Sequence, residues 1–359
     1  MIYLYIESLI GILSFVEITS KTLRVFERKL ALILVFITLL LLASLRFEVG
    51  EDWKNYVLFY TDRNSSNVLE IGYRLINDLF SDLGLHYNFF LLFINSGALF
   101  FTYKFIYLNT KSKQIALLIF FYDIFFFLNL SGARQAIALS LICIGFNYAL
   151  KKRFLKYLFV VLLASTFHKS ALIALLIYFI PREGFNFYSI FKSIKFYLAL
   201  CVIIFISYVP IEFYIKFFED SYLKKVAFYL EYYTKSENIV MDYFKGAVKR
   251  SIVILFYFLY RRYLPCDNST HYFFNVYLIG FLIFLSLYFL SPDLGTRLSL
   301  YFTIFEILII GNLVYYIPRL EGRILILIAY FAVTGIKLFD YMNRDSYQYH
   351  SILSNVTHF

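Results

Sequence analysis

Residues 30–45 read LALILVFITLLLLASL, a run without a single charged side chain. A helix that crosses the hydrocarbon core of a bilayer needs about 20 mainly apolar residues, so this run and its flanks predict a transmembrane helix. Stretches of the same kind recur along the whole chain. We expect membrane spans at residues 2–19, 30–45, 88–107, 114–130, 134–150, 154–167, 170–181, 196–210, 249–260, 272–290, 298–317 and 323–340.

The composition agrees with a chain that has lipid as its main solvent. Hydrophobic residues make up 61% of the 359 residues and charged residues only 16%, where a soluble domain typically carries about 25% charged residues. This balance excludes an ordinary soluble domain. The predicted fold is therefore an all-α integral membrane protein, a polytopic bundle of about 11–12 transmembrane helices that forms one domain over residues 1–359.

The net charge of +10 has a pattern that sets the orientation of the bundle. Lys and Arg concentrate in alternate short loops, which by the positive-inside rule predicts that these loops are cytoplasmic. A basic surface for nucleic acid is not expected, because the charges are spread over these loops. The loops lie at residues 21–29, 104–113, 151–156, 182–195, 261–262 and 319–323.

Three segments shape the rest of the topology. Residues 154–181 are interpreted as two short helices that turn at 167–170, because a His-Lys pair in the middle of a bilayer is costly. Residues 46–87 and 211–248 are expected to be external, and 211–248 shows the alternation of apolar and charged residues typical of an amphipathic helix on a membrane surface. Glu7 and Glu17 interrupt the first apolar stretch, so we expect residues 2–19 to remain as the first helix.

Four ionisable side chains are the main functional candidates, since such groups near a span mark functional sites. Under this topology Arg46, Arg134, His168 and Arg297 all fall at the external end of the bundle. Arginine binds phosphate with a planar fork, which suits a lipid phosphate or pyrophosphate at the membrane surface. Histidine titrates near neutral pH and is a common general base. No zinc-ligand pattern occurs, and no metal is expected.

Each candidate also has a purely structural interpretation. Arg46 is long enough to reach the interface from the end of its helix, or to pair with Asp52. Gly50 fits a plain turn residue. Arg134 fits an anchor at a helix start, with Ser131 as the cap.

The remaining polar residues are open to the same two interpretations. His168 fits a hydrogen bond between helices, and Arg297 is one turn from Asp293. Asp123 and Glu306 lie deeper in predicted spans, where buried ion pairs or hydrogen bonds to tyrosine would satisfy them.

Five short motifs in this order resemble the EpsG-like branch of the Wzy-type bacterial polysaccharide (O-antigen) polymerases. They are R-F-x-V-G-x-D-W-x-x-Y at 46–56, E-x-G-Y-x-L at 70–75, R-Q-A-I-A at 134–138, F-H-x-S-A-L at 167–172 and R-L-S-L-Y-F at 297–302. The match extends from about residue 40 to residue 310. Trp53 is a mild departure, because a smaller or different aromatic residue usually follows the aspartate.

The resemblance implies a GT-C-like glycosyltransferase for polysaccharide or exopolysaccharide biosynthesis at the outer face of the bacterial inner membrane. Such an enzyme joins oligosaccharide repeat units carried on undecaprenyl pyrophosphate. Its expected partners are the lipid-linked donor and acceptor, membrane lipid and a chain-length regulator protein, and no cofactor is expected. The sugars, the linkage, the stereochemistry and the oligomeric state are not readable from the sequence.

The resemblance also implies roles for particular residues. Catalytic roles fall to Arg134, Arg297 and one proton acceptor, His168 or Asp52. The external segments would cover the sugar, with aromatic faces such as Trp53 and Tyr73 stacking on it. The residues expected to bind substrate are Arg46, Gly50, Trp53, Tyr56, Glu70, Tyr73, Gln135 and Tyr301.

Three other classes of function compete with this one. A flippase for lipid-linked oligosaccharides would need cations along a cavity that reaches both faces. A membrane acyltransferase would need a histidine with a nearby acid, and no acid follows His168. A structural membrane protein would tolerate replacement of the charged residues.

Overall fold

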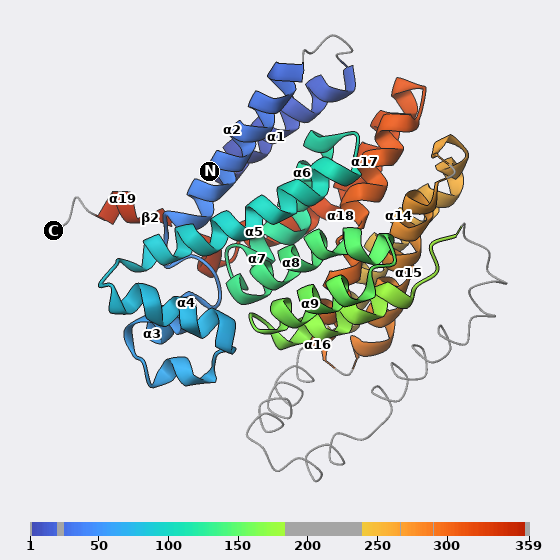
Figure 1. The fold of residues 1–359 in the computed structure, drawn as a ribbon. Helices are drawn as coiled ribbons and strands as arrows, with labels where there is room; N and C mark the ends of the chain where they lie inside the picture. Colours follow the sequence, from blue (N-terminus) through green and yellow to red (C-terminus); the bar gives the residue numbers. More distant parts are fainter. Residues whose placement is uncertain (1, 20–24, 184–238, 266, 290, 356–359) are drawn as a thin grey trace. The chain divides into compact units, whose positions relative to one another are not determined.

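The computed structural model describes residues 2–19, 25–183, 239–265, 267–289 and 291–355, and these are almost entirely helical (Figure 1). The expected all-α polytopic membrane fold is confirmed. Within these described ranges, five helices are long and apolar enough to cross a membrane, or six if one bent pair is a single span. Contacts group the chain into two compact units, residues 1–172, 260–264 and 307–359, and residues 173–259 and 265–306. The prediction of one domain stays a prediction.

The first unit is built around a row of apolar helices. Helix α2 packs on α5, α5 packs on α8, and α8 packs on α9, while α1 contacts α2, α6 and α18 (Figure 1). The bounds are α1 (Ile2–Thr19), α2 (Val25–Ser44), α5 (Tyr87–Asn109), α6 (Lys113–Phe120), α8 (Ala133–Leu150), α9 (Phe154–Ser165) and α18 (Leu320–Met342). The predicted spans 2–19, 88–107, 134–150 and 323–340 match α1, α5, α8 and α18 closely.

The predicted span 114–130 is not a regular helix. A π-helical turn, η2 (Phe121–Phe125), separates α6 from α7 (Phe126–Leu128). Asp123 in this turn is buried and accepts a hydrogen bond from the hydroxyl of Tyr330, and the ammonium of Lys337 donates to its backbone carbonyl at 2.8 Å. The expected hydrogen bond from a tyrosine to this buried aspartate is confirmed.

The two-part interpretation of residues 154–181 is also confirmed. Helix α9 ends at Ser165, and a 3-10 helix, η3 (Lys169–Phe179), follows after a turn. A residue distant in the sequence holds this turn, because the backbone N–H of Gly72 donates to the carbonyl of Thr166 at 2.8 Å.

The predicted external segment 46–87 folds into a short helical hairpin. It contains α3 (Trp53–Thr61), the 3-10 turn η1 (Ser65–Val68) and α4 (Ile71–Asp82). Asn77 and Ser81 of α4 donate side-chain hydrogen bonds to the carbonyls of Phe59 and Tyr60, at 2.9 and 2.8 Å, which join the two helices. One face of α4 is apolar and exposed, formed by Ile71, Leu75 and Leu79.

A small two-stranded sheet brings distant parts of the first unit together. Strand β1 (Arg46–Phe47) pairs antiparallel with β2 (His350–Ser351), which follows η5 (Asp345–Tyr347) and precedes α19 (Ile352–Asn355). The hydroxyl of Tyr3 donates to the carbonyl of Tyr347 at 2.8 Å. The start of α1, the end of α2 and residues 345–351 therefore lie at one end of this unit, in agreement with the topology expected from the loop charges.

The second unit contains the longest departure from the expected topology. Residues 239–248 were expected in an external amphipathic segment, but they open α14 (Ile239–Tyr260) and are continuous with the predicted span 249–260. Residues 196–210 and 211–238 lie outside the described residues. The predicted span 298–317 is broken at residues 304–305. The other described α-helices of this unit are α15 (Asn268–Leu287) and α16 (Pro292–Thr303). The short η4 (Arg261–Tyr263) and, apart from Glu306, α17 (Glu306–Tyr316) belong to the first unit.

In the second unit, the buried Glu306 forms an ion pair with a lysine. The ammonium of Lys249 on α14 lies 3.2 Å from its Oε1 atom. The interpretation of Glu306 as a member of a buried ion pair is confirmed.

Candidate active site

Arg46 is almost fully buried, which distinguishes it from a side chain that reaches out to the interface. It is 1% exposed, and its NH1 group donates to the backbone carbonyl of Asn129. Its guanidinium carbon lies 5.6 Å from the ring centroid of Trp53, within the range of a cation–π contact. Burial lowers the pKa of Arg46 from its ordinary value, yet an arginine remains charged at neutral pH. A permanent positive charge is therefore buried between the start of the hairpin and the turn before α8.

At Gly50, the loop that follows Arg46 passes very close to the turn before α8. Its φ is +106°, and a Cβ atom placed on it would lie 1.9 Å from the carbonyl oxygen of Leu130. Its N–H donates to the carbonyl of Ser346 at 2.7 Å. Gly50 is thus more than a plain turn residue, because only a residue without a side chain fits between residue 130 and the C-terminal segment.

Arg134 stands in the first turn of α8 and is fixed by two side chains of the hairpin. Its NH1 lies 2.7 Å from Oε2 of Glu70, and its Nε donates to the hydroxyl of Tyr56 at 3.2 Å. Glu70 is buried, whereas 26% of the Arg134 side chain is exposed. Gly132 occupies the cap position of α8 and makes no side-chain cap bond, so the expected cap by Ser131 is wrong.

The turn between α9 and η3 approaches the same glutamate. The backbone N–H of Lys169 is 3.4 Å from Oε1 of Glu70, so the two carboxylate oxygens of Glu70 face α8 and this turn respectively. The Nδ1 atom of the half-buried His168 lies 2.5 Å from the hydroxyl of Ser170. Glu70 therefore links the motifs that carry Arg134 and His168.

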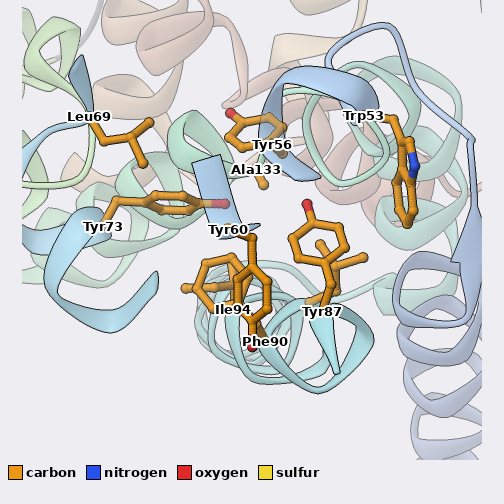
Figure 2. Packing of buried hydrophobic residues seen from close by; sticks show 10 residues of the cluster. Trp53, Tyr56, Tyr60, Leu69, Tyr73, Tyr87, Phe90, Ile94 and Ala133 are labelled. Atoms are coloured by element: carbon orange, nitrogen blue, oxygen red, sulfur yellow. The ribbon is translucent and has the colours of Figure 1, made fainter. Parts of the chain in front are cut away.

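Tyr56, which accepts a hydrogen bond from Arg134, belongs to a buried aromatic cluster (Figure 2). Tyr73 is fully buried in it and lies within electrostatic reach of both Arg46 and Arg134. Burial raises the pKa of Tyr73 well above its ordinary value. Its hydroxyl and the Nε of Arg46 have no hydrogen-bond partner in the described part of the chain. The labelled members of the cluster are Trp53, Tyr56, Tyr60, Leu69, Tyr73, Tyr87, Phe90, Ile94 and Ala133.

The burial of two aromatic residues corrects their expected stacking on sugar. Trp53 is 7% exposed and packs edge-on against Phe47 and Tyr87, and Tyr73 packs against Tyr56 and Phe90. Both side chains are buried in this structure, so neither offers an open platform for a ligand.

The first unit thus brings together most of the predicted site. Arg46, Gly50, Glu70 and Arg134 are joined by the contacts above, and His168 lies on the adjoining turn. Asp52 directly precedes α3 and is half-buried. Gln135, next to Arg134 on α8, is buried.

Arg297 and Tyr301 belong to the second unit and are described there alone. Arg297 is 2.6 Å from Asp293 one turn earlier on α16, so the structural interpretation as an ion pair is confirmed. Tyr301 is fully buried. Their expected roles in catalysis and binding stay predictions.

Several residues that position the site were not expected from the sequence. Asn88 donates to the backbone carbonyls of Ser44 and Arg46, at 2.7 and 3.1 Å, and so holds the end of α2. Arg344 lies 2.7 Å from Glu51 and fastens the C-terminal segment to the same loop. Only an N-x-S-G-x-R spacing at residues 129–134 hinted that Asn129 belongs to the site.

A family model described as the EpsG family matches residues 29–353. The chain belongs to the EpsG family. The match spans the hairpin, the turn at residues 166–170 and strand β2, so it covers the contacts of the candidate site. EpsG-like proteins are polysaccharide-polymerase-like membrane proteins of the Wzy type, which confirms the resemblance seen in the five motifs. No curated protein and no solved structure matched this EpsG-family chain.

The EpsG-family chain shows no clustered metal ligands in the part that is described. Among those residues, no group of three or more His, Cys, Asp or Glu side chains lies close enough to hold a metal ion. The polar chemistry available around Glu70 is that of a guanidinium, a carboxylate, an imidazole and backbone N–H groups.

Proposed function

We propose that this protein joins oligosaccharide repeat units carried on undecaprenyl pyrophosphate, at the outer face of the bacterial inner membrane. The observation that carries the proposal is the way Arg134 is held. Glu70 engages its NH1 and Tyr56 its Nε, and in the described part of the chain no hydrogen bond engages NH2. A partly exposed guanidinium with one nitrogen left over is suited to one oxygen of a ligand phosphate.

The reaction would use this charge where negative charge develops. An acceptor sugar hydroxyl attacks C1 of the donor sugar, the new C1–O bond forms, and the bond from C1 to the pyrophosphate oxygen breaks. Undecaprenyl pyrophosphate then leaves with the electron pair. A cation already in place stabilises that charge without reorganisation, which lowers the barrier. Arg134 is the catalytic cation of the proposal, and the buried Arg46 adds a fixed positive charge behind it.

A base must take the proton of the attacking hydroxyl. His168 is the preferred base, because the adjacent Lys169 N–H approaches the same Glu70 that binds Arg134. The Ser170 hydroxyl, 2.5 Å from Nδ1, orients the ring. Asp52 is the second candidate for this role.

The surface near this site suits a substrate with a lipid tail. The exposed apolar face of α4 begins at Ile71, directly after Glu70, and continues through Leu75 and Leu79. A helix with one apolar and one polar face lies in the plane of a membrane interface. An α4 helix in that position would hold Glu70 and Arg134 at the depth of a lipid headgroup.

The test compares Arg134→Ala, Arg134→Lys and His168→Ala in full-length protein, in cells that lack the chromosomal copy. The expected result is loss of long glycan chains and accumulation of single repeat units outside the cell, with protein level unchanged. Lysine keeps the charge but not the fork, so Arg134→Lys should recover only part of the chain length.

A matched control removes an exposed arginine of the same hairpin. Arg63→Ala breaks only a surface ion pair with Asp82 and should leave chain length normal. Normal chains from a well-expressed Arg134→Ala variant would contradict the proposal. Repeat units retained on the cytoplasmic side would point to a flippase instead.

A further inference from the structure

A second polar site lies at the opposite end of the first unit, where the basic loops gather. Arg28 and Lys29 begin α2, and Lys111 and Lys113 stand at the start of α6. Together they line a cavity of about 480 Å³. The two carboxyls at this cavity are those of Glu17 and Glu27. The Glu17 carboxylate is occupied, because it accepts backbone N–H groups of Lys113 and Gln114 at 2.9 and 3.0 Å. The cavity therefore has a surplus of positive charge.

The buried side-chain amide of Gln114 is a second indication that this cavity binds a ligand. Gln114 is 5% exposed and lines the cavity, and both its Nε2 and Oε1 atoms have no hydrogen-bond partner in the described part of the chain. A buried amide without partners costs free energy of folding unless something fills both roles. A ligand with an acceptor and a donor, such as a phosphate beside a hydroxyl, would satisfy it.

An apolar groove adjoins this polar cavity. The second cavity, of about 380 Å³, lies between α2 and α5 and shares Lys29, Leu32 and Tyr107 with the first. Beyond these shared residues it is lined mostly by hydrocarbon and rings, among them Ile33, Phe36 and Phe100. Lys104 stands at its side. Basic side chains above an apolar groove between two membrane helices match a charged headgroup and its acyl chain.

We propose that these two cavities form a binding site for one anionic glycerophospholipid. Its phosphate lies among Lys29, Lys111 and Lys113, and a glycerol or headgroup hydroxyl meets Gln114. One acyl chain occupies the groove along Ile33 and Phe36. The lipid fills the space between α1, α2 and the start of α6, and so joins the N-terminal helices to the rest of the unit.

Native mass spectrometry of the full-length protein in detergent tests this site with phosphatidylglycerol and phosphatidylcholine. Phosphatidylglycerol should bind more tightly, and Lys29→Gln with Lys111→Gln should weaken it at least about tenfold, since each removed charge near an anionic lipid is worth roughly 1 kcal/mol. Lys151→Gln with Lys156→Gln removes two exposed lysines elsewhere in the first unit and should leave binding unchanged. Equal binding of both lipids, or equal effects of both double variants, would overturn the proposal.

The groove has its own test. Ile33→Trp fills the apolar cavity and should abolish retention of the phospholipid, whereas Ile37→Trp, one turn further along α2 and outside the residues that line either cavity, should not. Competition experiments distinguish a bound glycerophospholipid from other ligands that carry a phosphate. Displacement of the lipid by inorganic phosphate at equal concentration would assign the site to a free anion, and displacement by an equimolar polyprenyl phosphate would assign it to the glycan carrier. Either result would overturn the proposal.

Discussion

Arg134 and Glu70 come from different parts of the chain, and the NH1 of the arginine lies 2.7 Å from Oε2 of the glutamate. Glu70→Ala would leave the largely buried guanidinium without its carboxylate. We expect a loss of about 1–3 kcal/mol in the free energy of unfolding, less than for a fully buried pair because 26% of the arginine side chain is exposed. The melting temperature of purified protein in detergent measures this change.

The hairpin contains a matched control for that prediction. Arg63 and Asp82 also form an ion pair, but their side chains are 70% and 56% exposed. Asp82→Ala should cost less than about 1 kcal/mol, because water screens exposed pairs. Equal losses in the two variants would show that burial of the Arg134 pair adds nothing to stability.

Gly50→Ala should disrupt the loop that carries Arg46. The new methyl group would meet the Leu130 carbonyl, which belongs to the backbone and has little room to move. Gly84→Ala is the control: its φ is also positive, at +66°, but nothing lies within 4 Å of the added Cβ. We expect Gly84→Ala to cost about 1–2 kcal/mol and to keep long glycan chains. Gly50→Ala should lose both stability and chain length, and equal melting temperatures would contradict this.

The C-terminal segment should be needed for the site although it contains none of the predicted catalytic residues. Truncation after Asn343 removes Arg344, Ser346 and strand β2, and with them every described contact that holds the loop 46–51 from that side. Helix content by circular dichroism should change little, while glycan polymerisation is lost. Truncation after Asn355 removes none of these contacts and should behave like the full chain. Activity of the shorter protein would contradict the prediction.

Because of the buried Tyr73, we expect the folded protein to lose stability at alkaline pH. Because burial raises the pKa of Tyr73 in the folded state above its unfolded value, the neutral phenol stabilises the fold fully below about pH 10. This contribution is lost as pH rises further toward the folded pKa. Tyr73→Phe removes the titrating group, so its melting temperature should fall less between about pH 8 and pH 10.5 than that of the wild type.

The hydroxyl itself adds a second expectation for Tyr73→Phe. Since it has no hydrogen-bond partner in the described residues, its removal should leave the melting temperature at pH 8 unchanged or raise it. Tyr315→Phe, at a side chain that is 49% exposed, controls for loss of a phenol elsewhere. A large loss of stability at pH 8 would mean that the hydroxyl has a partner.

The sequence predicted those features that depend on local physics. Apolar runs located most helices, and the cost of a His-Lys pair in lipid located the break after α9. Gly50 was predicted as a site residue from its place in the motif at 46–56. The fold of the 46–87 hairpin was harder to predict, because the aromatic side chains that it buries pack on rings of α5, which are distant in the sequence.

The contacts that define the candidate site depend on distant residues, which a single sequence does not pair. Nothing near Glu70 indicates that Arg134 is its partner, and the short β1 and β2 strands have no strand-like alternation. Trp53 and Tyr73 were expected to face a sugar because aromatic residues often do, but the same property makes them good core residues. The π-helical turn at Phe121–Phe125 leaves the apolar pattern of its span unchanged, so hydropathy does not reveal it.

The pairing of β1 with β2 has a consequence for biogenesis. Arg46 is translated long before its strand partner, which follows α18 in the chain. The loop bearing the buried cation therefore lacks this strand pairing until α18 has been translated. A chain translated only as far as α18 would have the helices of the first unit but not the strand pair that fixes Arg46.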